Sequence, residues 1–286
     1  MSRSLLLAVS GGLDSMCMLH FLAGKALGVA YINHGVRKDA AEDSALIKKK
    51  CEEYNVPFYE LSITLGKKNF EAAAREARYN LLFELKTKLG ASFLATAHHR
   101  DDQAETVFLR IARGTGLKGL RGIMAERPDG VIRPMLQFTK QNLLEYARQH
   151  NIEWREDSTN KNINHFRNKV RLEILPHFEK STIDSLARIA ELSQKIYAKL
   201  IKALDAYFNP FLVSCGNGTV VLRHFYLPPF AGYGELLRLW LGSKGISWEE
   251  TNEDAKFYEK MQGSASFRFR LGKVSFVRKQ GILYIC

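Results

Sequence analysis

The sequence predicts an α/β fold in which a parallel sheet carries helices on both faces, followed by a smaller α+β domain. Strand-like apolar runs alternate with helical stretches through the first half of the chain, and repeated β–α alternation produces a parallel sheet. After about residue 178 the pattern changes to one long helical stretch and then to short strands. We therefore expect two domains in the 286 residues, 1–178 and 179–286.

The elements of the first domain follow from short apolar runs and helical periodicity. Thr139 is placed to cap the last helix, and Gly90 is placed to end the third. We expect strands over 5–9, 29–35, 57–63, 91–99 and 130–136, and helices over 15–26, 40–56, 69–90, 101–113 and 139–151.

The second domain has fewer and more varied elements. A helix is expected over 181–208, and Gly216-Asn217-Gly218 forms a turn that leads into a strand. Another helix is expected over 232–245. The tail over 265–286 alternates apolar with polar or basic residues, which predicts a small β-hairpin or meander.

Composition narrows the class of protein. Hydrophobic residues make up 46% of the chain, which is typical of a globular protein, and no apolar run is long enough to cross a membrane. The N-terminus does not resemble a signal peptide. The 4 cysteines have no CxxC spacing, which argues against a disulfide framework or a thiolate metal site. We therefore expect a cytoplasmic protein.

The charge is strongly basic. The chain has 42 Lys and Arg against 30 Asp and Glu, a net charge of +12. Lys and Arg neutralise backbone phosphates, so a polyanionic partner such as RNA is expected. A basic soluble protein without such a partner is the alternative.

The first strand leads into a loop rich in glycine and serine. Two adjacent glycines let the backbone approach a ligand, and the following helix offers free N–H groups and the positive end of its dipole. Asp14 suits a phosphate-bound Mg2+ better than a bare phosphate. A tight strand-to-helix turn is the alternative. The loop residues are Ser10, Gly11, Gly12, Leu13, Asp14 and Ser15.

Acidic side chains follow the fourth strand. His98 ends that strand, and Asp101, Asp102 and Glu105 lie within one turn of the next helix. Ligands of parallel sheets bind at the carboxyl ends of the strands, and an acidic site there suits a cationic substrate. The alternative is a helix N-terminus with favourable charges.

The loop resembles the phosphate-binding loop of the PP-loop ATP pyrophosphatases, which implies a Rossmann-like PP-loop ATPase domain. Further segments, in one order and spacing, resemble the tRNA(Ile)-lysidine synthase family across 5–178. The final hundred residues resemble that family's middle domain more loosely, so a short form is expected. The matching segments are 33–37, 69–82, 95–120, 132–136 and 154–176.

The resemblance implies a reaction. ATP, with Mg2+, adenylates O2 of the wobble cytidine in a CAU-anticodon tRNA(Ile), and pyrophosphate leaves. The ε-amine of free L-lysine then attacks C2 and expels AMP, which gives lysidine. No protein partner and no membrane is required, and a homodimer is compatible with this reading.

The expected site residues combine the resemblance with the local chemistry. The loop 10–15 and Arg78 bind ATP, with Arg78 at the α-phosphate and Asp14 facing the metal ion. Asp14, Arg78, His98, Asp102 and Glu105 are expected to be catalytic. Asp102 and Glu105 are also expected to bind lysine. The residues expected at the tRNA are Arg113, Asn168, Arg171, Arg268 and Arg270.

Some of these residues have plainer readings. Arg113 and Gly114 also suit the end of a helix, and the tail arginines also suit a solvated hairpin face. Arg75 is expected to be solvated or ion-paired. We expect core or surface positions for His20, His34, His99 and His165.

Two other functions remain open. A tRNA thiolation enzyme of the same superfamily would need a reactive cysteine or a cysteine-bound iron–sulfur cluster. Cys17 falls in the first helix and the other three cysteines fall outside every motif. A non-catalytic nucleotide- or RNA-binding module would have no use for His98, Asp102 and Glu105 together.

Overall fold

The computed structural model describes residues 4–33, 40–63, 70–156, 169–225, 232–248, 253–263 and 266–286. It divides into two compact units, Met1–Ser193 and Gln194–Cys286. The division falls inside one long helix, 15 residues beyond the change of pattern at 178. The sequence does not indicate a boundary inside this helix, because the composition does not change there. The change of pattern near residue 178 is the only boundary signal that the sequence offers.

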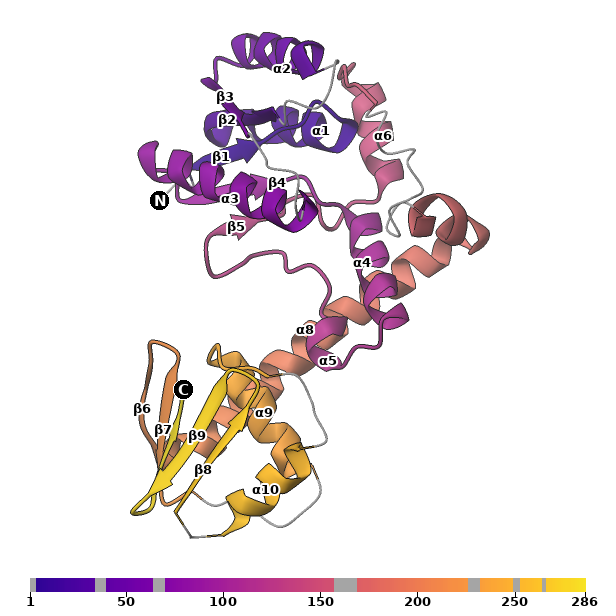
Figure 1. The fold of residues 1–286 in the computed structure, drawn as a ribbon. Helices are drawn as coiled ribbons and strands as arrows, with labels where there is room; N and C mark the ends of the chain where they lie inside the picture. The colour runs from indigo at the N-terminus through magenta and orange to yellow at the C-terminus, as the bar shows by residue number, and fades with distance from the viewer. Residues whose placement is uncertain are drawn as a thin grey trace. The chain divides into compact units, whose positions relative to one another are not determined.

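The first unit contains the expected parallel sheet (Figure 1). Its strand order is β3-β2-β1-β4-β5, so β1 lies at the centre. Leu7 of β1 pairs with Val29 on one side and Ala95 on the other, and all three are completely buried. The strands are β1 (Leu5–Ala8), β2 (Ala26–Asn33), β3 (Phe58–Ser62), β4 (Phe93–Thr96) and β5 (Val131–Ile132).

Helices cover both faces of this sheet, as the α/β prediction requires. Side chains of α1, α2 and α6 share one core with the sheet, and α3 contributes to the other. The expected cap is confirmed, since Asn142 N donates to Thr139 Oγ1 over 3.1 Å. The helices are α1 (Leu13–Leu22), α2 (Ala40–Glu53), α3 (Phe70–Lys88), α4 (Arg100–Ala112), α5 (Leu117–Leu120) and α6 (Lys140–Gln149).

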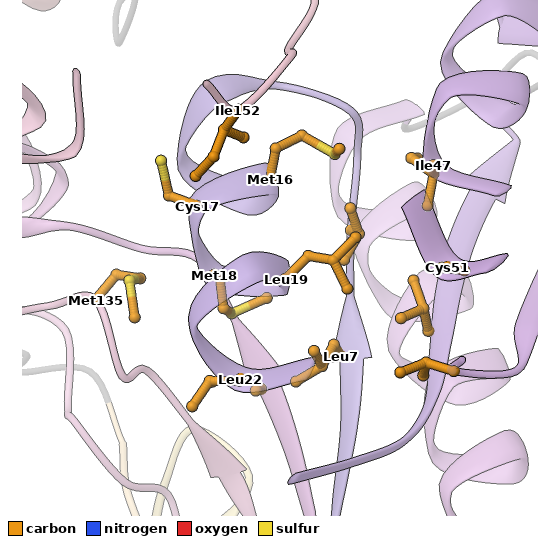
Figure 2. Close-up of a cluster of buried hydrophobic side chains, with 14 of the residues drawn as sticks. Leu7, Met16, Cys17, Met18, Leu19, Leu22, Ile47, Cys51, Met135 and Ile152 are labelled. Atoms are coloured by element: carbon orange, nitrogen blue, oxygen red, sulfur yellow. The ribbon is translucent and has the colours of Figure 1, made fainter. Parts of the chain in front are cut away.

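Helix α1 fills the centre of the first core (Figure 2). Met16 and Leu19 are almost fully buried there, together with Ile47 and Cys51 of α2. The helix is shorter than the sequence suggests, because a 3-10 turn over Ala23–Lys25 follows it and leads directly into β2. This core fixes α1, and with it the loop that precedes α1.

Helix α4 leaves the sheet and packs against a later segment of the same unit. Val107 and Ala104 of α4 form a small core with Val170 and Ala190. Arg100 reinforces the packing through an ion pair of 2.5 Å between its Nε and Asp184 Oδ1. The later segment is a π-helical turn (Val170–Ile174), a 3-10 turn (Leu175–His177) and the start of α8 (Lys180–Phe208).

The second unit holds an antiparallel sheet of order β6-β7-β10-β9-β8. The expected turn has Asn217 and Gly218 at φ +50° and +74°, which is the geometry of a two-residue hairpin. Trp240 and Phe257 are completely buried against the sheet. The elements are β6 (Leu212–Gly216), β7 (Thr219–Arg223), α9 (Tyr233–Ser243), α10 (Asp254–Gln262), β8 (Phe267–Leu271), β9 (Val274–Lys279), β10 (Ile282–Ile285) and a 3-10 turn (Asn209–Phe211).

None of the helices in the described part of the chain combines the length and the apolar content that a membrane crossing requires.

Candidate active site

The glycine loop between β1 and α1 has an internally bonded shape. Ser10 N donates to Ser15 Oγ over 3.1 Å, and Ser15 Oγ donates to Gly12 O over 2.9 Å. Gly11 has φ +85°, a conformation that favours glycine. Gly12 is the N-cap of α1, so the first backbone N–H groups of that helix have no acceptor within the helix and are available to a ligand at the loop. This geometry fits the cradling of an anion such as phosphate.

Two segments distant in the sequence brace this loop. Arg155 N donates to Gly11 O over 3.0 Å, and Arg155 Nε donates to Asp43 Oδ1 over 2.9 Å. Asp43 is 6% exposed, and a Cβ added to Gly11 would lie 3.4 Å from the Cβ of Asp43. Arg155 therefore links the loop backbone to α2. This brace could not be predicted from the sequence, because Asp43 and Arg155 lie 112 positions apart.

His99, rather than His98, lies at the centre of the acidic cluster. It is 4% exposed, and its Nε2 lies 3.5 Å from both Asp14 Oδ2 and Asp102 Oδ2. Its Nδ1 lies 3.4 Å from Asp101 Oδ2. Burial alone lowers the pKa of His99, but the three carboxylates outweigh burial and raise it to about 10.

The cationic His99 connects the glycine loop to α4. His99 N also donates to Asp102 Oδ2 over 3.0 Å, at the start of the helix. The sequence predicts a core or surface position for His99; the side chain is buried, and its carboxylate partners were not expected. The expected His98 has its Nδ1 3.0 Å from Thr96 Oγ1 at the end of β4.

Asp102 and Glu105 lie on one side of α4, as the spacing predicts, and share one cation. Arg171 Nε donates to Glu105 Oε1 over 2.6 Å, and its Nη2 reaches Glu105 Oε2 at 2.9 Å and Asp102 Oδ1 at 3.1 Å. Glu105 is only 2% exposed. Arg171, expected at the tRNA, thus neutralises the two carboxylates expected to bind lysine.

Asp14 retains one unused oxygen. Its Oδ1 is buried and has no hydrogen-bond partner in the described part of the protein, while its Oδ2 faces His99. Within the same residues no group of three His, Cys, Asp or Glu side chains could hold a metal ion alone. A Mg2+ ion bound mainly by phosphate oxygens needs only one or two carboxylates, and Asp14 fits that requirement.

Arg78 lies half-buried on α3, with its guanidinium 5.7 Å from the centre of the Tyr79 ring. Burial lowers its pKa, and the neighbouring charge of Arg75 lowers it further. An arginine that is already desolvated and next to a second cation is a strong site for an anion. This is the property that an α-phosphate contact requires.

The remaining tRNA candidates are dispersed. Arg113 is exposed at the end of α4, where Gly114 at φ +74° ends the helix. Arg268 and Arg270 are both exposed on β8, two residues apart on one face of the sheet. Asn168, His34 and His165 lie outside the described residues.

The cysteines show no reactive thiol beside the loop. Cys17 is buried in α1, where burial raises the pKa of its thiol to about 12. Burial likewise raises the pKa of Cys51 to about 11. Cys215 and Cys286 are exposed, and both belong to the second unit. A thiolate nucleophile at the glycine loop is therefore not supported.

Known proteins are similar to this chain in sequence and in fold. A family model described as a PP-loop domain matches residues 1–178. A curated tRNA(Ile)-lysidine synthase of Clostridium tetani is 35% identical over 251 residues, which is 82% of this chain and 54% of that protein. Another, from Chlorobaculum tepidum, is 38% identical over 225 residues, 71% of this chain and 68% of that protein.

The matches differ in coverage. The chain spans about half the length of the synthases of Clostridium tetani and Clostridioides difficile, 54% and 48%. Among solved structures, the U34-tRNA thiolase NcsA of Methanococcus maripaludis, with its 4Fe-4S cluster, is similar with a TM-score of 0.58 at 20% identity. That similarity covers 68% of this chain and 72% of the thiolase, and it shows the fold alone.

Proposed function

The chain belongs to the tRNA(Ile)-lysidine synthase family of PP-loop proteins, and from this membership we propose that it joins free L-lysine to the wobble cytidine of a CAU-anticodon tRNA(Ile). The reaction consumes ATP and yields AMP and pyrophosphate. It runs in two steps. O2 of the cytidine displaces pyrophosphate from the α-phosphate, and the lysine ε-amine then attacks C2, loses a proton and expels AMP.

The glycine loop binds the phosphates of ATP in this proposal. Its support is the set of N–H groups at the start of α1 and the backbone fixed by Ser15 and Arg155. Arg78 stabilises the negative charge that develops at the α-phosphate. Asp14 would hold Mg2+, which supplies charge neutralisation for the departing pyrophosphate.

Asp102 and Glu105 bind the ammonium group of lysine. Two carboxylates that already satisfy one partly buried guanidinium can also satisfy an ammonium, since both cations donate several hydrogen bonds. Free lysine has an ε pKa of about 10.4, so the attacking amine has to lose a proton first. A neighbouring carboxylate is the acceptor for that proton.

The tRNA contacts the protein through its backbone. The net charge of +12 supports this, and Arg113, Arg268 and Arg270 are exposed and basic. Such contacts position the RNA without reading its sequence. The cytidine has to leave its stack to reach ATP, which costs a few kcal/mol that backbone contacts offset. A tRNA substrate supports a cytoplasmic location as part of this proposal.

The observation that carries the proposal is one continuous charged unit. Asp14, whose Oδ1 is unpaired among the described residues, is joined through its Oδ2 and His99 to Asp102, so the phosphate loop and the acidic site are linked. A plain anion-binding module has no need for that link. Adenylation and the attack by lysine, by contrast, need both sites next to each other.

The test measures pyrophosphate release and incorporation of labelled lysine with a CAU-anticodon tRNA(Ile) transcript. We expect incorporation that requires ATP and is lost with a transcript that carries U in place of the wobble cytidine. ATP-dependent incorporation of sulfur instead of lysine would favour a thiolation enzyme. Binding of ATP and tRNA with no pyrophosphate release would favour a binding module.

A further inference from the structure

Four arginines gather around one tyrosine in the first unit. The guanidinium carbons of Arg75, Arg78 and Arg127 lie 5.4, 5.7 and 5.2 Å from the centre of the Tyr79 ring. Arg133 belongs to the same group, since Tyr79, Arg127 and Arg75 all act on its pKa. We refer to these four side chains as the arginine cluster.

The arginine cluster is short of negative charge. Asp129, which pairs with Arg127, is the single carboxylate that forms an ion pair with any of the four among the described residues. Arg133 is 6% exposed, and its Nε is buried with no hydrogen-bond partner in that part of the chain. A buried donor without an acceptor is costly, and a bound acceptor would remove the cost.

The cluster members also repel one another. Burial lowers the pKa of Arg133, and the charges of Arg127 and Arg75 lower it further. Cation–π contacts with Tyr79 offset part of this repulsion. They do not supply the acceptor that Arg133 Nε lacks.

The members of the cluster other than Arg78 lie beside the glycine loop rather than in it. Tyr79 belongs to the core that α3 forms with the sheet, whereas α1 belongs to the core on the other side. Arg133 directly follows β5, which is two strands away from β1, or roughly 10 Å at the usual strand spacing. Arg133 therefore reaches the carboxyl edge of the sheet beside the proposed ATP site and outside it.

We propose that Arg75 and Arg127, supported by the positive charge of the buried Arg133, form a binding site for RNA backbone phosphates, used by the tRNA that the proposed function requires. Guanidinium groups present a planar fork that matches the oxygens of a phosphodiester. Several such forks over one surface suit a chain of phosphates better than a single small anion. Tyr79 is only 8% exposed, so its ring is covered and does not stack on a base.

This site extends the proposed reaction and rests on it in one respect, the identity of the RNA. Arg78 remains at the ATP α-phosphate, and Arg75 and Arg127 hold the RNA next to it. The cluster thus places the two polyanionic substrates side by side. Neighbouring cations lower the repulsion between them.

The experiment compares two double variants by filter binding of the CAU-anticodon tRNA(Ile) transcript at several KCl concentrations. Arg75→Gln/Arg127→Gln removes two cluster charges from exposed or part-exposed positions. Lys48→Gln/Arg148→Gln is the matched control, because it removes two exposed charges from α2 and α6. Thermal unfolding and ATP affinity are measured on the same preparations.

For the cluster variant we expect the slope of log affinity against log salt to fall by roughly one per lost phosphate contact. ATP affinity should stay within about twofold, and the melting temperature should not fall, because like charges are being removed. A slope equal to that of the control variant overturns the proposal. Weakened ATP binding with unchanged tRNA binding also overturns it, and assigns the arginines to the nucleotide.

Lysine incorporation by the wild-type protein separates this inference from the proposed function. If incorporation occurs but the slope is unchanged, the phosphate site is wrong and the synthase activity stands. If the wild-type protein does not incorporate lysine but the slope of log affinity against log salt is still reduced in the cluster variant, the phosphate site stands as a general RNA site. The proposed synthase activity is then wrong.

Discussion

The acidic cluster at α4 and the arginine cluster at Tyr79 belong to the same unit but differ in how their charge is compensated. The four carboxylates of Asp14, Asp101, Asp102 and Glu105 each lie within 3.5 Å of one of two cations, His99 and Arg171. Among the residues that the structure describes, the arginine cluster has one paired carboxylate, Asp129, for four guanidinium groups. Every carboxylate of the first cluster contacts a cation of the protein, and we call this cluster closed. In the second cluster most of the guanidinium groups have no carboxylate partner among the described residues, and we call this cluster open.

The difference indicates how each cluster affects the stability of the folded protein. A closed cluster stabilises the protein and has to exchange a cation when lysine binds. An open cluster stores repulsion that an anionic ligand relieves, so its members contribute to binding at the expense of stability. Substitutions in the two clusters should therefore change stability in opposite directions.

Arg171→Gln is expected to have the largest effect. It leaves Asp102 and Glu105 without their shared cation, and breaking a partly buried pair of this kind costs about 3 kcal/mol. Urea unfolding measures the change in the free energy of unfolding. The double variant Arg171→Gln/Glu105→Gln should lose less than the sum of the single variants. A loss below about 0.5 kcal/mol would mean that the cluster is not closed by Arg171.

Asp14→Asn tests whether the closed cluster takes part in the reaction of ATP. Loss of the charge at Oδ1 should reduce pyrophosphate release at least tenfold while the protein stays folded, because the metal ion loses its carboxylate. Asp101→Asn is the matched control, since Asp101 also faces His99, at 3.4 Å. Equal activities of the two variants would remove Asp14 from the ATP site.

Glu105→Gln separates the lysine site from the ATP site. We expect about a tenfold higher lysine requirement, because one charge-assisted contact to the ammonium is lost. Cytidine adenylation, followed as a single-turnover burst of pyrophosphate, should remain nearly intact. Equal losses in both steps would place Glu105 at the ATP or its metal ion.

Asp43→Asn tests the ion pair between Asp43 and Arg155, which belongs to neither cluster. Its partner Arg155 also holds the Gly11 carbonyl, so loosening the pair should raise the KM for ATP about threefold to tenfold with little change in kcat. The control is Glu42→Gln, which also removes a carboxylate from Arg155 but at a side chain 63% exposed. The same KM in both variants would show that the brace does not position the loop.

The fold of the first unit could be predicted because its signals are local. Apolar runs such as Leu5–Ala8 mark buried strands, and Thr139 marks a helix start. In the second unit the sequence missed β6, most of whose residues are exposed, and the short helix α10. An exposed edge strand lacks the alternation that a half-buried strand shows.

The site was predictable as a set of motifs but not as a set of contacts. His98 and His99 are adjacent, and which of them faces the carboxylates depends on the direction the chain takes into α4. The pairing of Arg171 with Glu105 joins positions 66 residues apart. Spacing within one helix predicts only that Asp102 and Glu105 share a side.

The placement of the cysteines gives the molecule two levels of thiol reactivity. Alkylation and oxidation proceed through the thiolate, so the buried Cys17 and Cys51, with pKa values of about 12 and 11, are protected at neutral pH. Cys215 and Cys286 are exposed on the antiparallel sheet. A maleimide fluorophore will therefore label the second unit alone, and will report on that unit when tRNA binds without modifying the PP-loop.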